Sequence, residues 1–294
     1  MKPLIIIPAH NEEENIAYCL KSLEAQTFRD FRVVIVNDGS TDHTSEIAKT
    51  FADSDERFQV LDLQKSEHEP GAKVVRTFYK GLETQELSEF DVVCKFDADI
   101  VFPSNYLEKI TEIYSQNPKA GMVSGLVFIQ KKGMPKTELL HFENQEGWEY
   151  ENLSSQNHIR GPIKSYRVDC LQDMGGLRAV LGWDNIDVML AKMHGWETIS
   201  IKNLWVKHLR PTAYKYKQQK AEKLGMYFYN IGLNFPLTVI SSVKSAYKNK
   251  LLSEFFITMK SFLKQNQPRQ LSKNEIKFIR KLRWKEMLNK LNFK

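Results

Sequence analysis

Short apolar runs alternate with amphipathic stretches along the first half of the chain. Several of these runs are apolar throughout, which is typical of strands that are covered on both faces of a sheet. The gaps between them hold helical patterns, such as residues 11–26, where Ile16, Leu20 and Leu23 share one face. This β-α-β-α order predicts an α/β protein with a mainly parallel central sheet flanked by helices. The expected strands span residues 3–9, 31–38, 58–63, 90–99 and 120–129.

The net charge of +6 conceals an uneven distribution of acidic and basic residues. Residues 1–214 carry 24 Lys and Arg against 32 Asp and Glu, whereas residues 215–294 carry 18 against four. The basic stretch also has apolar residues at helical spacing, which is typical of helices that lie on an anionic membrane surface or that cap a domain. Its aromatic residues fit one helix face rather than a platform for stacked bases, so no nucleic-acid partner is expected. We therefore expect an α/β domain over residues 1–212 and a basic amphipathic helical extension over residues 213–294.

The cysteine content and the lack of long apolar segments predict a cytoplasmic protein. Cys19, Cys94 and Cys170 are odd in number and lack the spacing of a metal site, so they are expected to be reduced thiols. No stretch reaches about 18 uninterrupted apolar residues, so no transmembrane span is expected. The first apolar run lacks a small-residue cleavage site, and no secretion signal is predicted. The basic extension would allow peripheral contact with the inner face of the membrane.

Polar side chains gather where three of the expected strands end, in the segments PAHNEE, VNDGSTD and FDADI. Ligands of an open parallel sheet bind beyond the carboxyl ends of its strands, so we expect these segments to share a cleft. In the second segment Gly39 permits a tight turn, and Ser40 or Thr41 caps the next helix. That arrangement leaves the Asp38 carboxylate to accept hydrogen bonds from a ribose or a base. The alternative is an ordinary strand-turn-helix joint.

The third segment places two carboxylates, Asp97 and Asp99, two positions apart. Holding like charges together in a cleft is costly unless a cation lies between them and a ligand. Mg²⁺ and Mn²⁺ prefer oxygen ligands, and substrate phosphates often supply some of them. The pair therefore predicts a divalent metal site, and the alternative is a solvated turn.

The three segments, in this order and spacing, resemble the inverting glycosyltransferases of family 2, which have the GT-A fold. The resemblance covers roughly residues 3–212. It implies that Asp97 and Asp99 form the D-x-D pair, that Asp97 also contacts the nucleotide-sugar donor, and that Asp38 contacts its nucleotide. It also places a basic residue, Arg76, near the donor and a glycine, Gly161, where backbone approaches the substrate. The loop that would frame the base comprises Pro8, Ala9, His10, Asn11 and Glu12.

The same resemblance places the catalytic base in the segment GWDNIDVMLAKMHGW. Relatives read Glu-Asp, any residue, then Asp at this position, whereas this chain has Asp184, Asn185 and then Asp187. An amide cannot take a proton, so the base is Asp184 or Asp187, and the place of Asp184 at the expected helix start favours it. The alternative for Asp187 is a charge that faces the helix dipole. His208, in WVKHLRPT, resembles a metal or diphosphate contact of the family, and the alternative is a structural histidine.

These expectations describe an inverting, metal-dependent transfer of one sugar from a nucleotide-sugar, either a UDP-sugar or GDP-mannose. The acceptor would be a saccharide or a lipid-linked saccharide in cell-surface polysaccharide or glycolipid synthesis. The segment RKLRW imitates the Arg-Trp signature of processive synthases, but it lies much farther from the base, so single addition is predicted. Because Asn185 departs from the family pattern, the alternative is a non-catalytic nucleotide-sugar-binding or scaffold protein with a decayed site.

Overall fold

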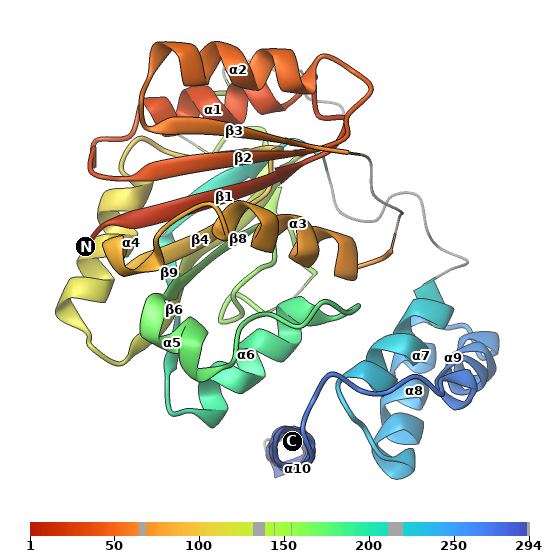
Figure 1. The fold of residues 1–294 in the computed structure, drawn as a ribbon. Coiled ribbons are helices and arrows are strands. Elements are labelled where there is room, and N and C mark those ends of the chain that lie inside the picture. The colour runs from red at the N-terminus through yellow and green to blue at the C-terminus, as the bar shows by residue number, and fades with distance from the viewer. Residues whose placement is uncertain (65–68, 132–138, 144, 154, 211–219, 293–294) are drawn as a thin grey trace.

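The computed structural model describes residues 1–64, 69–131, 139–143, 145–153, 155–210 and 220–292. Helices flank one central sheet, and the last four helices of the chain form a separate group beside them (Figure 1). The strands are β1 (Pro3–Ala9), β2 (Arg32–Asp38), β3 (Phe58–Leu63), β4 (Val92–Phe96), β5 (Ile100–Val101), β6 (Ala120–Gln130), β7 (Trp148–Tyr150), β8 (Ile163–Arg167) and β9 (Glu197–His208). The helices are α1 (Ile16–Glu24), α2 (Thr44–Ser54), α3 (Ala72–Leu82), the 3₁₀ turn η1 (Leu87–Glu89), α4 (Tyr106–Gln116), α5 (Val168–Asp173), α6 (Trp183–Met193), α7 (Lys220–Asn230), α8 (Phe235–Asn249), α9 (Ser253–Lys264) and α10 (Lys273–Asn292).

The sheet has the order β3-β2-β1-β4-β8-β6-β9-β5, and β7 pairs with β6 outside this path. Strands β1 to β4 are parallel to one another, which confirms the predicted β-α-β-α half of an α/β fold. Beyond β4 the sheet becomes mixed, because β8 runs antiparallel to both β4 and β6. Strand β9 is parallel to β6, and β5 returns antiparallel to β9.

Strands β1, β2 and β4 are buried on both faces because they are apolar at nearly every position, whereas the edge strand β3 is partly exposed. On β1, Ile5 and Ile7 join the core beneath α1, α2 and α4, whereas Leu4 and Ile6 join the core beneath α3, α5 and α6. Successive strand residues point to opposite faces, so a continuous apolar run supplies both cores. Burying one such side chain contributes about 1.5–3 kcal/mol. The five predicted apolar runs therefore appear as β1, β2, β3, β4 and β6.

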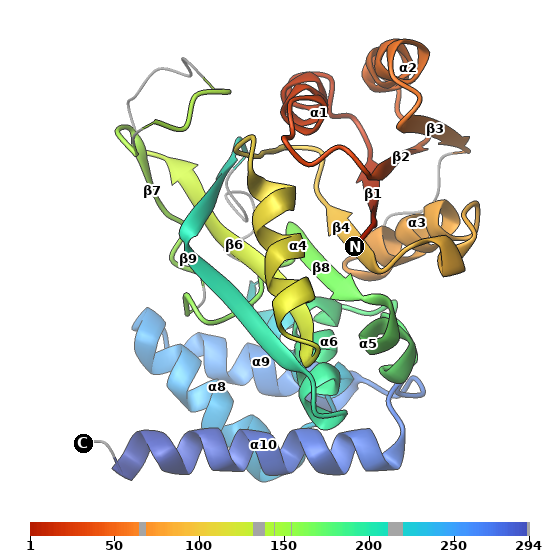
Figure 2. The same cartoon turned by 90° about the vertical axis from the view of Figure 1, so that its left-hand side faces the viewer.

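The C-terminal helices share a core with the rest of the chain. Phe228 of α7 and Phe262 of α9 are buried in the same apolar cluster as Trp183 and Ile186 of α6. The Asn230 side chain also donates a hydrogen bond to the Leu181 carbonyl, at 3.0 Å. Figure 2 shows α10 running beneath α8 and α9. The predicted boundary between residues 212 and 213 lies outside the described residues.

Two features of these helices bear on membrane contact and on processive addition. Among the helices that the structure describes, none is long and apolar enough to cross a membrane. The segment RKLRW lies inside α10, where Arg280 donates a hydrogen bond to the Gly232 carbonyl at 2.7 Å. That arginine therefore ties α10 to the turn between α7 and α8.

Candidate functional site

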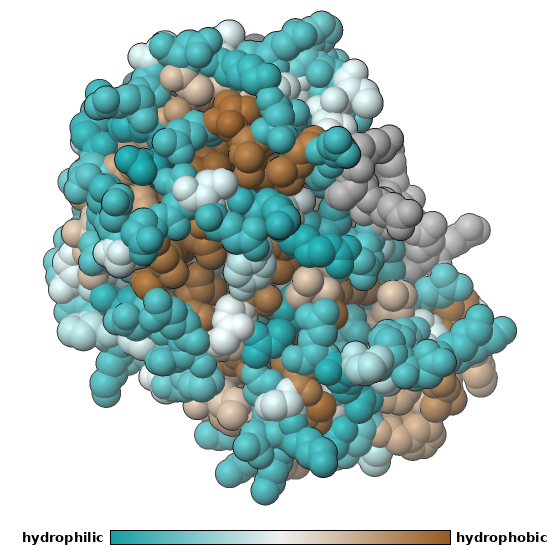
Figure 3. All heavy atoms as spheres, in the orientation of Figure 1, coloured by the Kyte–Doolittle hydropathy of each residue, from teal (hydrophilic) through white to brown (hydrophobic). Residues whose placement is uncertain are grey.

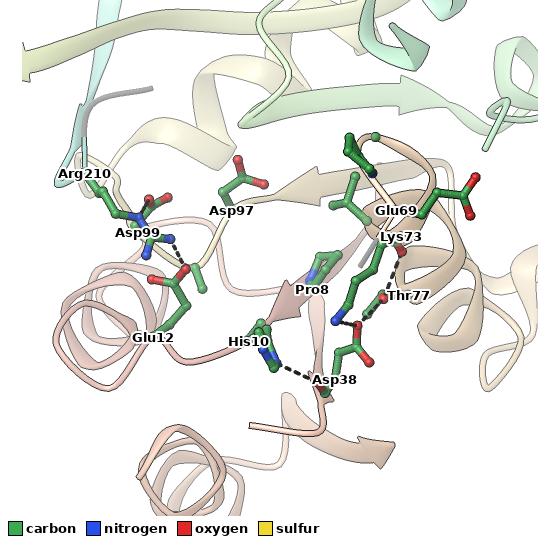
Figure 4. Close-up of a pocket in the computed structure, with 15 residues that line it drawn as sticks. Pro8, His10, Glu12, Asp38, Glu69, Lys73, Thr77, Asp97, Asp99 and Arg210 are labelled. Atoms are coloured by element: carbon green, nitrogen blue, oxygen red, sulfur yellow. Dashed lines mark hydrogen bonds and ion pairs between the residues drawn. The ribbon is translucent and has the colours of Figure 1, made fainter. Parts of the chain in front are cut away.

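A cavity of about 300 Å³ opens at the carboxyl edge of the parallel strands (Figure 4). The strand register explains its position, because Ala9 pairs with Asn37 and Ile6 pairs with Lys95, which brings the ends of β1, β2 and β4 to one edge. The predicted gathering of the three polar segments is thus present in the structure. The cavity is lined by Pro8, Ala9, His10, Glu12, Asp38, Glu69, Pro70, Gly71, Lys73, Val74, Thr77, Asp97, Ala98, Asp99 and Arg210.

The loop after β1 is held by the loop after β2. Asn11 has a φ of 54°, and its side-chain oxygen accepts a hydrogen bond from the Thr41 N–H at 2.8 Å. Asparagine tolerates this left-handed conformation better than most residues. His10 Nδ1 donates to the Asp38 carbonyl at 2.7 Å. Of the five loop residues predicted to frame a base, four line the cavity, whereas Asn11 shapes the loop.

Asp38 lines the cavity, but α3 already engages its carboxylate. Lys73 Nζ lies 3.1 Å from Asp38 Oδ2, and Thr77 Oγ1 donates to the same oxygen at 3.2 Å. Lys73 and Thr77 are one helical turn apart, so they face the cavity together. The side chain of Asp38 is only 3% exposed. The expectation that this carboxylate stays available for a ribose or a base is therefore wrong for Oδ2.

Arg76 does not line the cavity, contrary to the expectation from the sequence. Its side chain is 54% exposed and pairs with Glu69 at the cavity rim. Lys73 lies three positions before Arg76 on α3, and its side chain lines the cavity. Lys73 is therefore the basic residue of α3 that lines the cavity, and a donor contact of Arg76 stays a prediction.

Asp97 is paired with a buried lysine from the end of β4. Lys95 Nζ forms an ion pair with Asp97 Oδ1 and lies 5.2 Å from the centre of a Trp183 ring. The lysine nitrogen is also 3.5 Å from the Gly161 carbonyl. Asp97 is about one-third exposed, so the pair stands at the border between the buried strand and the cavity.

Asp99 pairs with His208 and Arg210, and Glu12 shares the second of these cations. His208 Nε2 lies 3.4 Å from Asp99 Oδ2, and Arg210 Nε lies 3.5 Å from the same oxygen. Arg210 also pairs with Glu12, which Figure 4 shows on the side of the cavity opposite Lys73. Burial and the Asp99 charge raise the pKa of Glu12, although Arg210 opposes that rise. Arg210 therefore links the loop after β1 to the D-x-D pair.

His208 lies at the end of β9 between two carboxylates. Its Nδ1 is 3.3 Å from Glu151 Oε2, and Arg160 pairs with that same oxygen at 2.7 Å. Burial alone would lower the pKa of His208, but the hydrogen bonds and charges of Asp99 and Glu151 prevail and raise it to about 9. The imidazole therefore carries a positive charge near neutral pH in this arrangement.

The chemistry of these side chains fits a divalent cation. Asp97 and Asp99 offer carboxylate oxygens toward one cavity, and His208 offers an imidazole nitrogen next to Asp99. Mn²⁺ accepts both donor types, and Mg²⁺ prefers the oxygens. Within the described ranges, no group of three or more such side chains is already arranged as a metal site. Lys95 pairs with Asp97 and His208 pairs with Asp99, and a histidine must be neutral to bind a metal.

Asp184 lies in the first turn of α6 and is partly exposed. A Cβ atom built on Gly161 would stand 3.5 Å from Asp184 Oδ2, so glycine at this position keeps the space beside the carboxylate open. Since Gly161 is also near Lys95, which pairs with Asp97, Asp184 lies toward the Asp97 side of the cavity. Neither Gly161 nor Asp184 lines the cavity itself.

Asp187 lies one turn further along α6 and is fully enclosed. Lys164 Nζ lies 2.8 Å from Oδ1 and 2.7 Å from Oδ2, and the Tyr166 hydroxyl donates to Oδ2 at 2.7 Å. Burial raises the pKa of Asp187, and Lys164 opposes that rise. The carboxylate is 1% exposed. Asp187 thus forms a buried ion pair instead of the expected charge that faces the helix dipole, and its carboxylate is closed to an acceptor in this geometry.

Several charged side chains of the site were missed from the sequence: Lys73, Lys95, Glu151, Lys164 and Arg210. Lys95 and Lys164 left a usable signal, because each interrupts a short segment whose other residues are mostly apolar or small. Lysine is almost never fully buried unless it is paired, so a lysine within a segment expected to be buried predicts an acidic partner nearby. Glu151 left no comparable signal, since its segment is irregular and polar.

Comparison with known proteins supplies the family. Residues 4–171 match the model named Glycosyl transferase family 2. A poly-beta-1,6-N-acetyl-D-glucosamine synthase of Staphylococcus epidermidis is 25% identical over 175 residues, which are 58% of this chain and 40% of that protein. The chain spans less than half the length of each of the curated relatives it matches.

Solved structures support the GT-A fold. The structure of S. aureus TarS 1-349 in complex with UDP-GlcNAc aligns with a TM-score of 0.57 at 20% identity, covering 89% of this chain and 73% of that one. The mannosyltransferase PcManGT from Pyrobaculum calidifontis, in complex with GDP-Man and Mn²⁺, aligns with a TM-score of 0.55 at 15% identity, covering 94% and 72%. With its family model matched over more than half of its length, this chain belongs to glycosyltransferase family 2 and has the GT-A fold.

Proposed function

We propose that this glycosyltransferase moves a single sugar from a nucleotide-sugar, most simply a UDP-sugar, to an acceptor hydroxyl with inversion of configuration. The observation that carries the proposal is the common cavity of the β1 loop, Asp38 and the D-x-D carboxylates, with Asp184 beside it. Both structural neighbours described above were solved with a nucleotide-sugar bound. The polysaccharide synthase among the relatives supports a saccharide or lipid-linked saccharide acceptor, in cell-surface polysaccharide or glycolipid synthesis.

The donor would lie across the cavity with its base against the β1 loop. Pro8 and His10 offer one wall for the base, while Asp38 and Lys73 face it from β2 and α3. The diphosphate would then extend toward Asp97 and Asp99, where Arg210 supplies positive charge from just beyond the end of β9. This orientation brings the sugar to the Gly161 and Asp184 side of the site.

Mg²⁺ or Mn²⁺ would be held by Asp97 and Asp99, with His208 as a further ligand in its neutral form. Bound there, the cation would neutralise the charge that develops on the departing nucleoside diphosphate. Lys95 pairs with Asp97 and Arg210 pairs with Asp99, and these contacts orient the two carboxylates. The chemistry of the donor set supports this assignment, and so does the Mn²⁺ bound by the mannosyltransferase PcManGT.

Asp184 would act as the general base. Its carboxylate would take the proton of the acceptor hydroxyl as that oxygen forms a bond to the anomeric carbon. The bond from the anomeric carbon to the diphosphate oxygen breaks at the same time, and the electron pair leaves with the nucleoside diphosphate. Attack from the face opposite the leaving group inverts the configuration, and no covalent sugar intermediate forms.

A panel of nucleotide-sugars tests the proposal. Purified protein with Mn²⁺ should release the nucleoside diphosphate from one member of the panel, at least slowly with water as acceptor, and chelation of the metal should stop the release. The anomeric configuration of a transferred sugar, read by NMR, should be opposite to that of the donor. Failure to turn over any member would favour the alternative of a binding or scaffold protein with a decayed site.

Replacing Lys73 with methionine should weaken binding of the nucleoside diphosphate by about tenfold or more. The change removes a positive charge from the cavity lining, and a hydrogen bond from such a charge to a bound anion contributes about 1.5–3 kcal/mol. Arg76→Met, on the same helix, is the matched control, because its exposed ion pair is worth little. Calorimetric titration measures both variants. Equal losses of affinity in the two variants would show that Arg76 contributes to donor binding as much as Lys73 does.

A further inference from the structure

We propose that the outward face of α8 and α9 binds an anionic membrane surface and so brings the enzyme to a lipid-linked acceptor. The inference rests on the proposed function, since it gives that acceptor a location. Nine of the fifteen large apolar side chains that are exposed in the described part of the chain lie between residues 235 and 263. This concentration marks one surface of the molecule, which we call the α8–α9 face.

The apolar side chains of the α8–α9 face recur at helical spacing. On α8 they include Ile240, Val243 and Tyr247, and Tyr247 is 86% exposed. On α9 they include Leu252, just before the helix, then Phe256 and Leu263. Positions three and four apart share one side of a helix, so these residues form a stripe rather than scattered contacts.

The opposite sides of the same helices are already buried, which fixes the orientation of the stripe. Leu237 and Ala246 of α8 and Phe262 of α9 are buried, and the Ser242 hydroxyl lies 3.6 Å from the Met259 sulfur across the α8–α9 contact. The C-terminal helices therefore cap the fold with one face and present an apolar face outward. The two interpretations of the extension, a cap or a membrane contact, apply to different faces of the same helices.

The charges on the α8–α9 face favour an anionic lipid surface over a second copy of the chain. Five lysines lie between residues 235 and 264, against one acidic residue, Glu254, which accepts a hydrogen bond from Asn249 at 2.7 Å. A symmetric dimer through this face would bring like charges together, and such juxtaposition disfavours association. Anionic headgroups attract the same lysines while the apolar stripe enters the interface. The lysines are Lys244, Lys248, Lys250, Lys260 and Lys264.

The α8–α9 face is placed well for an acceptor that arrives from a membrane. Figure 1 shows α7, α8 and α9 on the side toward which β1, β2 and β3 point, which is the side of the cavity. Figure 3 shows tan and brown atoms at the lower right, where Figure 1 places α8 and α9. The C-terminal helices also contact the segment that carries Asp184. The Tyr227 ring of α7 packs so closely on Gly182, two residues before Asp184, that a Cβ atom at Gly182 would clash with it.

Flotation of the full chain with vesicles tests the inference. Vesicles of phosphatidylcholine with phosphatidylglycerol should carry the protein upward at low salt, and high salt should weaken this binding. Pure phosphatidylcholine vesicles should carry much less. Lys244→Gln with Lys248→Gln should lower the association about 25-fold, from about fivefold for each lysine. The matched control is Lys21→Gln with Lys119→Gln, two exposed lysines elsewhere on the chain, which should change it less than about threefold.

A second variant pair tests the apolar stripe. Val243→Ser with Tyr247→Ser should reduce flotation at both salt concentrations, whereas Tyr18→Ser, an exposed aromatic of α1, should not. Circular dichroism checks that each variant is folded. Absence of flotation with anionic vesicles, or equal losses in the α8–α9 and control variants, would overturn the inference. A dimer in light scattering that the α8–α9 variants dissociate, without flotation, would show self-association instead and would also overturn it.

Donor turnover in lipid-free buffer separates this inference from the proposed function. The same preparations of wild type and of the α8–α9 variants should release the nucleoside diphosphate at similar rates, because the substituted side chains lie outside the cavity. Retained turnover without flotation would contradict the membrane inference and leave the proposed function standing. Flotation without turnover would support the membrane face and contradict the proposed function.

Discussion

Replacing Asp184 with asparagine should slow sugar transfer by about 10²-fold or more while leaving donor affinity unchanged. The amide keeps the size of the side chain but cannot take the acceptor proton, and loss of a positioned base typically costs this much. Because the carboxylate adjoins Gly161 and does not line the cavity in which we propose that the donor binds, the donor should bind as before. Rates of transfer to an acceptor, with calorimetric titration of the nucleoside diphosphate, measure the two effects separately.

The neighbouring residue supplies the control for this experiment. Asn185→Ala changes a partly exposed side chain in the same helical turn and should alter the rate by no more than a few-fold. An Asp184→Asn enzyme that transfers sugar as fast as the wild type would show that the base is elsewhere. In that case Asp187 becomes the candidate again, and the tight enclosure of its carboxylate must open during the reaction.

Replacing Lys164 with methionine should lower the free energy of unfolding by about 3–5 kcal/mol. The substitution leaves the Asp187 carboxylate buried without its cation, and breaking a buried ion pair on one side typically costs this amount. Denaturant unfolding followed by circular dichroism measures the change. Lys80→Met is the matched control, since its pair with Glu83 is exposed and should contribute at most about 1 kcal/mol.

A double variant separates loss of the charge pair from loss of packing. Lys164→Met with Asp187→Leu removes both charges and should recover much of the stability, because apolar residues often replace a buried pair without loss. If Lys164→Met is no more costly than Lys80→Met, the pair is not a structural support of α6. Activity measurements on Asp187 variants need this comparison, because a destabilised α6 would also displace Asp184.

The parallel half of the sheet was predictable because three of its four strands are buried on both faces. Apolar residues at nearly every position of β1, β2 and β4 leave little choice of structure. Strands β8 and β9 were missed, since IKSYR and ETISIKNLWVKH mix charged and apolar residues. Lys164 is buried in β8 only because Asp187 of another element neutralises it. Such a strand shows no alternation of apolar and polar residues. Its sequence shows only an isolated lysine, because the partner of that lysine is set by the tertiary structure.

The candidate site was predictable at the strand ends and not beyond them. The rule that ligands of such sheets bind beyond the carboxyl ends brought His10, Asp38 and Asp97 together correctly. The residues that face them from helices could not be assigned, because the start of α3 sets which side chains face the cavity. With α3 beginning at Ala72, Lys73 faces the cavity and Arg76 faces solvent.

The affinity of the nucleoside diphosphate with and without Mn²⁺ tests the central claim most directly. Calorimetric titration of UDP, and of GDP in parallel, should show binding to the wild type that strengthens when Mn²⁺ is present. Asp99→Ala should remove the strengthening by the metal, whereas Asp53→Ala, an exposed carboxylate of α2, should preserve it. If Mn²⁺ strengthens binding to the Asp99→Ala variant as much as to the wild type, the metal does not bind at the D-x-D pair.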